Sequence, residues 1–229
     1  MSAKGWIIAV SVVAVVGAGA VAADRVIART TEERVSQAVV DNLEDVTGTP
    51  TVEMGGFPFL TQVLRGSIDT MTVTVDGATL GGLRATDVVF EGTSVSTTQP
   101  YTVGEAQVVA VLPTSSLQTV VAERTGLDLT LTVDGSTMRV AGSLLGIDLS
   151  AAIEPGVEDG ALVVDVVDIE LGGVTITIDD LPDAIGSVLS GLRVPIDELP
   201  EGMTLASVSV MPDGLAVTAT GTDVVLEQP

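Results

Sequence analysis

Alternating apolar and polar residues dominate the chain after residue 50 and predict a series of β-strands. In residues 67–76, Met71, Val73 and Val75 fall on one face and threonines on the other. Similar runs predict strands near residues 51–54, 67–76, 84–96, 101–112, 127–134, 138–144, 147–154, 161–171, 174–178, 205–211 and 215–226. Tight hairpin turns are predicted at the Asp-Gly pairs that begin at Asp76, Asp134, Asp159 and Asp213. We therefore expect a mostly antiparallel meander.

A helical period precedes the strands, in residues 24–46. Its apolar stripe consists of Ala28, Val35, Ala38, Val39, Leu43 and Val46. A Thr-x-x-Glu capping box at Thr30 predicts a bend or a restart there, and Gly48 with Pro50 predicts the end. Such a long stripe must lie on a sheet, and the pattern leaves open whether the helix packs on the sheet or is wrapped by it.

Two shorter helices are predicted between strands. One follows Pro113 with a Ser-x-x-Gln capping box at Ser115. The other opens at Asp180 and Pro182, and two glycines within it make it a candidate mobile flap. Its apolar positions at helical spacing are Ile185, Val188, Leu189 and Leu192.

Residues 55–66 hold two of the three Phe residues and join the long helix to the first long strand. Pro58 fixes its own φ and favours an extended conformation at Phe57, so Phe57 and Phe59 are expected on a stiff, extended segment. The pattern is compatible with a core plug or with the lip of a groove that dips into a membrane.

This stretch also carries a family resemblance. Gly-Phe-Pro-Phe-Leu-Thr-Gln-Val-Leu-Arg-Gly at residues 56–66, followed by a Val/Thr strand, resembles the LmeA-like phospholipid-binding family of high-GC Gram-positive (actinobacterial) cell envelopes. The run at 205–225, with Ser-Val-x-Val-x-x-Asp-Gly-Leu-x-Val, is similar to the closing hairpin of that family. The resemblance covers about residues 24 to 227. It implies an envelope lipid binder linked to lipoglycan assembly, with a tubular lipid-binding-like fold in which a curved antiparallel sheet wraps a long helix.

The N-terminus predicts the compartment. Residues 5–23 carry no charge and would span roughly 28 Å as a helix, close to the thickness of a bilayer core. Residues 1–23 are compatible with a signal anchor (a transmembrane helix) or with a signal peptide cleaved near Ala20-Val21-Ala22. In either case the remaining single domain, 24–229, is expected on the extracytoplasmic face of the cytoplasmic membrane, either anchored or secreted.

Composition then removes several classes of function. The chain has 31 acidic and 9 basic residues, a formal net charge of -22, which excludes a nucleic-acid partner and disfavours flat electrostatic docking on anionic lipid. It has no His and no Cys, so the usual catalytic triads and thiol chemistry lack their parts, and no cofactor is expected. The remaining candidates for chemistry are carboxylates, which we expect to be solvated: Asp165, Asp168, Glu170, Asp179, Asp180, Asp183, Asp197, Glu198 and Glu201.

The apolar residues favour binding over catalysis. Residues 161–169 do not alternate cleanly, which predicts aliphatic groups on both faces of that strand. Helices could cover both faces, or one face could line a groove for acyl chains. Arg65 is a candidate phosphate ligand or a plain surface residue. The candidate lipid-binding residues are Phe57, Pro58, Phe59, Leu60, Leu64, Arg65, Ile185, Val188, Leu189 and Leu192.

The sequence therefore predicts an α+β fold: an N-terminal membrane helix, then a long amphipathic helix on a highly curved, mostly antiparallel sheet with two further short helices. The predicted function is non-enzymatic phospholipid binding, with shuttling as a possible extension, by an apolar groove in the cell envelope. Two alternatives remain: a scaffold domain that binds an envelope protein partner along a sheet edge, and a carboxylate-based enzyme that processes glycans.

Overall fold

The fold is described from a computed structural model of the chain. The description covers residues 3–80, 83–125, 129–144, 147–176, 192–194 and 199–226, and for residues 3–21 it covers the backbone. Three helices occur in these ranges: α1 (Ala3–Asn42), α2 (Phe59–Arg65) and α3 (Thr114–Thr125). The strands form two antiparallel sheets, so the predicted α+β class is confirmed, with two sheets in place of one.

Sheet A has the strand order β1-β3-β4-β5-β13-β12, and β2 also pairs with β3. Its strands are β1 (Glu44–Thr47), β2 (Thr51–Gly55), β3 (Ser67–Leu80), β4 (Leu83–Ser96), β5 (Tyr101–Pro113), β12 (Met203–Met211) and β13 (Gly214–Leu226). Sheet B has the order β10-β9-β8-β7-β6, and β11 also pairs with β9. Its strands are β6 (Thr130–Asp134), β7 (Thr137–Leu144), β8 (Ile147–Glu158), β9 (Ala161–Leu171), β10 (Val174–Ile176) and β11 (Leu192–Val194). Within the described ranges neither sheet closes on itself.

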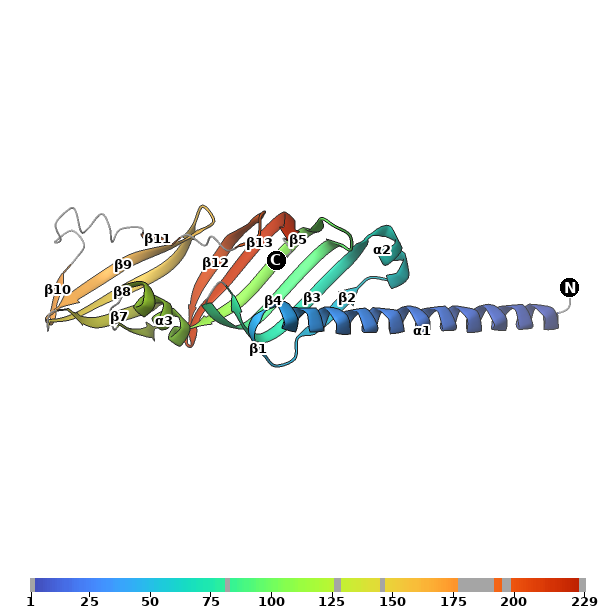
Figure 1. Ribbon diagram of the computed structural model, residues 1–229, viewed down its shortest axis with the longest axis horizontal. Helices are drawn as coiled ribbons and strands as arrows, with labels where there is room; N and C mark the ends of the chain where they lie inside the picture. The colour runs from blue at the N-terminus through green and yellow to red at the C-terminus, as the bar shows by residue number, and fades with distance from the viewer. Residues whose placement is uncertain are drawn as a thin grey trace.

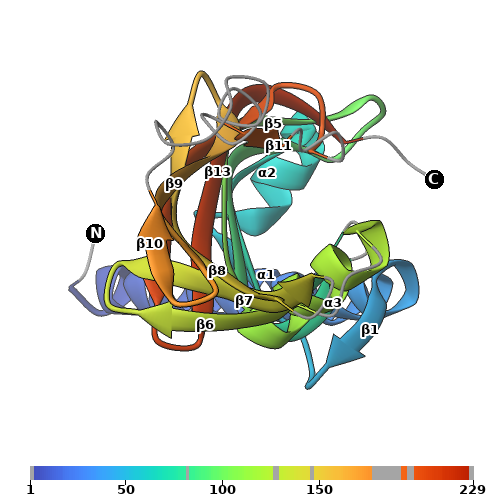
Figure 2. The ribbon, with the colours of Figure 1, turned by 90° about the vertical axis from the view of Figure 1, so that its left-hand side faces the viewer.

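The two sheets follow one another along the long axis of the molecule. Figure 1 shows sheet A in the middle, sheet B at one end, and the N-terminal part of α1 projecting beyond sheet A at the other end. Figure 2 shows that sheet B is strongly curved, turning from β9 to β6 around the side on which α3 lies. The sequence predicted one highly curved sheet under the long helix, whereas the strongly curved sheet is sheet B and α1 packs on sheet A.

Helix α1 is one continuous helix, and the predicted restart at Thr30 is wrong. The hydroxyls of Thr30 and Thr31 donate hydrogen bonds to the carbonyl oxygens of Val26 and Ile27, 3.0 and 2.9 Å away. They therefore bond back to the preceding turn and do not cap a new helix. The helix also ends earlier than predicted, at Asn42, because the next residues form β1 and place Val46 in a strand.

The C-terminal half of α1 packs on sheet A, as its stripe predicts. Ala28 is buried in the core, and Val35, Val39 and Leu43 are partly buried against it. Two polar side chains of α1 bind the neighbouring edge. The carboxylate of Glu32 accepts the backbone N–H of Met54 at 2.9 Å, and the hydroxyl of Ser36 donates to the carbonyl oxygen of Pro50 at 2.6 Å. The helix thus satisfies backbone groups of an edge strand that would otherwise be open to pairing.

The N-terminal segment was predicted to be a membrane helix. Among the helices of the described part, none combines the length and the apolar character that crossing a bilayer requires. The assignment of residues 1–23 to a membrane segment stays a prediction.

Three of the four predicted Asp-Gly turns are confirmed. The chain reverses after Asp134, at Asp159 and at Asp213, each time between paired strands. The turn at Asp76 is wrong, since β3 continues through it and Gly77 pairs with Thr47 on one side and Thr86 on the other. Pairing on both sides holds this stretch extended, and the chain turns back only between Leu80 and Leu83.

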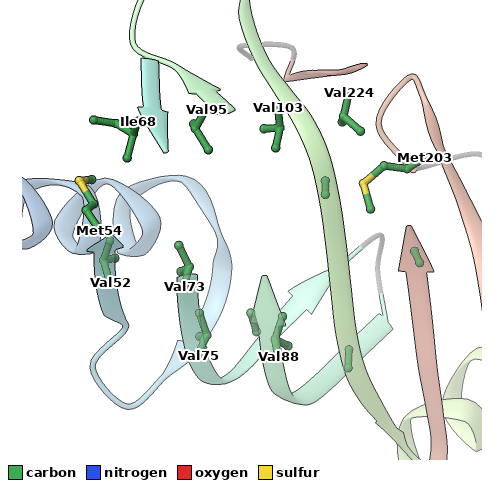
Figure 3. Packing of buried hydrophobic residues seen from close by; sticks show 14 of the residues in the cluster. Val52, Met54, Ile68, Val73, Val75, Val88, Val95, Val103, Met203 and Val224 are labelled. Atoms are coloured by element: carbon green, nitrogen blue, oxygen red, sulfur yellow. The ribbon is translucent and has the colours of Figure 1, made fainter. Parts of the chain in front are cut away.

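The core of sheet A contains two strand residues in the left-handed conformation. One apolar row crosses four strands side by side as Ile68, Val95, Val103 and Val224 (Figure 3). The next core row, with Met71 and Ala106, lies three residues away along each strand, where strict alternation would put it on the opposite face. Between the rows, Ser94 of β4 and Asp223 of β13 have φ values of 52° and 51°. In these two strands a left-handed residue accompanies the change of face, which β3 and β5 make at the same level of the sheet.

The two sheets meet at an apolar seam. The buried residues there are Leu131 and Met138 of sheet B and Leu215 of sheet A, and Leu117 of α3 packs against them. At the other end of β12, the backbone N–H of Leu205 donates to the carbonyl oxygen of Gly160 in the β8–β9 turn, at 3.3 Å. The apolar faces of the two sheets therefore join through this seam.

A substitution at Ser94 tests the left-handed position. A β-branched residue is strongly disfavoured at positive φ, so Ser94→Val is expected to lower the free energy of unfolding by roughly 1–3 kcal/mol. Thr93→Val is the matched control, because it changes a neighbouring β-branched residue at ordinary φ. Chemical denaturation of both variants makes the comparison, and equal stabilities would refute the role given to Ser94.

Candidate lipid-binding site

One face of sheet B is apolar across its central strands. The register aligns Val133, Met138, Ile153 and Val166 in one row, and Leu131, Val140, Ala151 and Ile169 in the next. Two further rows pair Pro155 with Val164 and Val157 with Leu162. The opposite face carries mostly polar residues, among them Thr132, Arg139, Glu154, Asp165 and Asp168. Opposite residues of antiparallel strands share a face, so the eight aliphatic side chains of the first two rows form one surface.

A β-bulge at Val167 keeps this surface apolar along β9. Ile153 pairs with Val166 and Ala152 with Asp168, which leaves Val167 as an extra residue without a partner across the β8–β9 pair. The bulge shifts the alternation by one residue and places Ile169 on the same face as Val166. The prediction of aliphatic groups on both faces of this strand is confirmed for its first part, because Val163 is buried on the opposite face. The bulge explains why apolar and polar residues do not alternate regularly in residues 161–169.

The apolar face has a packed part and a less covered part. Near the seam, Leu131 and Met138 are buried against α3 and sheet A. Because Leu117 of α3 packs there, the apolar face is the concave side of the curved sheet seen in Figure 2. On β8 and β9, Val157, Leu162, Val164 and Val166 are half-buried. A concave, half-buried aliphatic surface is the kind that accepts an alkyl chain.

A second apolar surface lies on α2, which the sequence did not predict to be a helix. Phe59, predicted as a groove or plug residue, is 1% exposed and belongs to the core of sheet A. On the outer side of the helix, Leu60, Val63 and Leu64 are exposed, Leu64 by 89%, and Phe57 precedes them with 53% exposed. We call Phe57, Leu60, Val63 and Leu64 the α2 patch. The predicted residues Phe57, Pro58, Phe59, Leu60, Leu64 and Arg65 thus divide between one core anchor and an exposed surface.

Helix α2 is held by buried polar side chains. The carboxylate of Asp24 on α1 accepts the backbone N–H groups of Phe59 and Leu60, both at 2.9 Å. The side chain of Gln62, only 2% exposed, donates to the carbonyl oxygen of Gly55 at 3.2 Å and accepts the N–H of Asp69 at 2.6 Å. Gly66 ends the helix in the left-handed conformation, with φ 80°. Sequence analysis missed Asp24, whose only signal is that it is a charge at the end of a long uncharged run.

The environment of Asp24 favours its charged form. The hydrogen bonds from the backbone N–H groups of Leu60 and Phe59 lower the pKa of Asp24 below its ordinary value, and the nearby Arg25 charge adds a smaller effect in the same direction. Burial opposes them and raises this pKa, but the net shift is downward. Asp24 therefore acts as an ionised cap for the first turn of α2.

Two arginines flank the α2 patch. Arg25 lies over the ring of Phe57, with 5.6 Å between the guanidinium carbon and the ring centroid. Arg65 forms an ion pair with Asp69, with 2.7 Å between nitrogen and oxygen, and both side chains are more than half exposed. This pairing partly neutralises Arg65 and leaves its predicted role as a phosphate ligand untested.

The remaining predicted site residues come from the second short helix. Ile185, Val188 and Leu189 lie outside the described residues. Leu192 begins strand β11 and pairs with Val164 of β9, so its assignment to a helix is wrong. Strand pairing with β9 evidently outweighs the weak helical period here, in which Gly186 and Gly191 already lower helix propensity.

The structure also contains a hollow of about 510 Å³ on sheet A. Its side chains are mainly polar: Thr70, Thr72, Glu91, Thr93, Glu105, Gln107, Thr220 and Thr222. The row Met71, Gly92, Ala106 and Gly221 also lines the hollow, between the two polar rows. This mixed lining, with hydroxyl and carboxylate groups on both sides, suits an alkyl chain less well than the aliphatic face of sheet B.

The predicted carboxylates that the structure describes, Asp165, Asp168, Glu170 and Glu201, do not assemble into a centre for chemistry. Asp165 is exposed, and Asp168 lies 3.7 Å from the guanidinium of Arg139. Glu170 is exposed beside Ser150, whose hydroxyl it accepts at 3.2 Å, and Glu201 is exposed as well. Over the part of the chain that is described, no group of three acidic side chains is placed to hold a metal ion. The other predicted carboxylates, Asp179, Asp180, Asp183, Asp197 and Glu198, lie outside it.

Comparison with known proteins gives one match. A family model described as LmeA-like phospholipid-binding matches residues 22–220. No curated protein and no solved structure matches the chain. The matched range includes Asp24, α2, the seam and all strands of sheet B.

The capping role of Asp24 makes stability depend on pH. Because the pKa of Asp24 is lower in the folded chain, its contribution is complete above the ordinary carboxyl pKa of about 3.9 and is lost as the pH falls through the lowered value. Asp24→Asn is therefore expected to unfold at a lower temperature than the unchanged chain at neutral pH, and this difference is expected to shrink in acid. Thermal unfolding followed by circular dichroism measures it, with the exposed Asp165→Asn as control. A deficit of Asp24→Asn that stays constant into acid would contradict the assignment.

Proposed function

The chain belongs to the LmeA-like phospholipid-binding family, and from this premise we propose that it holds the acyl chains of a phospholipid against the apolar face of sheet B. The single observation that carries the proposal is the unbroken set of aliphatic rows on that concave face. The family match supplies the ligand class, and the rows supply a surface that suits its hydrocarbon part.

Burial of the acyl chains alone provides enough free energy for lipid to bind at such a site. Each buried methylene contributes roughly 0.8 kcal/mol, so a dozen of them contribute about 10 kcal/mol before the costs of ordering are subtracted. No charged contact is needed. This matters for a chain of net charge -22, which would repel an anionic headgroup over most of its surface. The proposal therefore leaves the headgroup near solvent and the tails on the protein.

The same proposal makes the protein a binder and not an enzyme. The chain has no His and no Cys, which removes the commonest bases and nucleophiles. Among the carboxylates considered for catalysis, the described ones, Asp165, Asp168, Glu170 and Glu201, are exposed or lie beside a basic or hydroxyl group, a typical arrangement for a solvated surface. The family is known for lipid binding, which supports this part of the proposal.

Location and wider role are further parts of the proposal. The uncharged run at residues 5–23 supports an N-terminal membrane segment, and hence a place on the extracytoplasmic face of the cytoplasmic membrane. From that position the protein would pass lipid between the membrane and envelope assembly, including lipoglycan assembly. A carrier that shelters only the tails suits such transfer, because the headgroup stays accessible to the next acceptor.

Adjacent valines of β9 offer a matched test. Val166 is half-buried on the apolar face, whereas Val167 is the bulge residue and 56% exposed. We expect the full chain, purified in a mild detergent, to carry phospholipid in native mass spectrometry. Val166→Asp is expected to abolish this adduct, because it buries a charge where the tails lie, and Val167→Asp is expected to retain it.

The readout must separate lipid loss from misfolding. Circular dichroism of each variant provides that control, and Val166→Thr, which keeps the shape and adds one hydroxyl, serves if Val166→Asp does not fold. Equal lipid retention by folded Val166→Asp, or by Val166→Thr in its place, and by Val167→Asp would overturn the placement of the site. An unmodified chain that carries no lipid and takes up none that is added would overturn the proposed function itself.

A further inference from the structure

The α2 patch is an apolar surface whose four side chains are each at least 40% exposed. Leu60, Val63 and Leu64 follow the i, i+3, i+4 spacing that places side chains on one side of a helix, and here that side faces outward. A short surface helix normally buries its apolar side and exposes its polar one. Helix α2 departs from this rule, because it buries the polar Gln62 and exposes Leu60, Val63 and Leu64. Its outer side is therefore expected to contact something apolar.

The helix that carries the patch is held in place by hydrogen bonds and by core packing. Asp24 binds the first turn of α2, Gln62 binds both β2 and β3, and the ring of Phe59 is fixed in the core. Gly56 also has no room for a side chain, since an added Cβ would lie 2.5 Å from Nε2 of Gln62. Exposed apolar side chains that sit on an ordered support indicate a surface for contact rather than a loose end.

The position of the patch identifies what it contacts. Asp24, which caps α2, directly follows the uncharged run of residues 5–23, and both lie on the single helix α1. Figure 1 shows α2 at the end of sheet A from which the N-terminal part of α1 projects. If residues 5–23 enter a bilayer, α2 lies at the bilayer surface. The reason is that α1 runs without a break from those residues to Asp24, which binds α2.

Local charge agrees with a lipid surface. Arg25 and Arg65 flank the patch, Arg65 in an ion pair with Asp69, and they are two of only nine basic residues in a chain of net charge -22. Basic residues beside an apolar stripe are typical of helices that lie in the membrane interface, where they meet lipid phosphates. A stable protein interface buries roughly 800 Å² on each partner, which is more than four side chains of this kind supply.

We propose that the α2 patch inserts into the outer leaflet of a phospholipid bilayer, at the boundary between headgroups and acyl chains. Contact there orients the β-domain on the membrane and presents it to the lipids of one leaflet. This inference rests on the proposed function in two respects: residues 5–23 are taken as a membrane segment, and the bilayer is taken as the source of the bound lipid.

The absence of Cys from the chain makes a site-specific test direct. Leu64→Cys, and separately Val174→Cys, is labelled with an environment-sensitive fluorophore on the full chain. Val174 is the matched control, because it is an exposed valine, 62% accessible, in β10 at the opposite end of the molecule (Figure 1). Both proteins are reconstituted into vesicles of phosphatidylglycerol and phosphatidylcholine, with and without nitroxide-labelled lipid.

The expected result is a blue-shifted emission for the label at Leu64, quenched more by a nitroxide near the headgroup than by one deep in the chain, since interfacial helices lie roughly 5–10 Å into the boundary. The label at Val174 is expected to report water. Adding Leu60→Asp to the Leu64→Cys protein is expected to return its emission toward that of water.

Two results would overturn the inference: a label at Leu64 that reports water in vesicles, or equal quenching of the labels at Leu64 and Val174. Native mass spectrometry of the same labelled chains separates this from the proposed function. Bound phospholipid together with a water-exposed Leu64 would reject the membrane contact alone, whereas an inserted Leu64 on a chain that never carries lipid would reject the proposed function alone.

Discussion

The apolar face of sheet B depends on the period of two that a β-strand imposes on its side chains. A strand keeps one face apolar only while its residues alternate without interruption, and a shift of one residue turns every later side chain to the other face. In β9 the aliphatic residues change phase between Val166 and Ile169, and the bulge at Val167 corrects for it. Sheet A has a related feature, since the left-handed residues Ser94 and Asp223 accompany the change of face between two apolar rows of one core. In both sheets, irregular backbone accompanies a regular surface.

These devices explain what the sequence could and could not predict. The strands other than β1 and β11, three of the four hairpin turns and the stripe of α1 follow from local patterns, so they could be predicted. The bulge at Val167 could not be predicted, because it is defined by the pairing with the partner strand. In the sequence alone, the irregular alternation that it causes is also compatible with aliphatic residues on both faces. Gly77 likewise carries a turn signal that pairing on both sides of β3 overrides.

Helix α2 was missed for a similar reason. It has seven residues, no side-chain cap of its own, and a start at Phe59 directly after Pro58, which favours extended structure before it. Its cap comes from Asp24, 35 residues earlier in the chain, and its second support from Gln62 binding two strands. A helix this short is stable only through such tertiary contacts, which no local pattern contains. The candidate residues on it were nevertheless found, because aromatic residues are rare in this chain and two of the three Phe residues lie here.

The two apolar surfaces give the acidic chain a consistent relation to lipid. The α2 patch lies at the end of the molecule where α1 continues toward the uncharged run, and the apolar face of sheet B lies toward the other end (Figure 1). The core of sheet A and the seam lie between them. With few basic residues to attract anionic lipid, hydrocarbon burial is the main attraction that the chain offers, and both surfaces are built for it.

Photocrosslinking tests the central claim most directly. A phospholipid with a photoactivatable group in its acyl chain is bound to the full chain, irradiated, and located by peptide mass spectrometry. The account predicts adducts on the concave side of β8 and β9, at Ile153, Leu162, Val164 or Val166. Adducts confined to the polar hollow of sheet A, around Thr72 and Gln107, would contradict it, as would adducts spread evenly over both faces of sheet B.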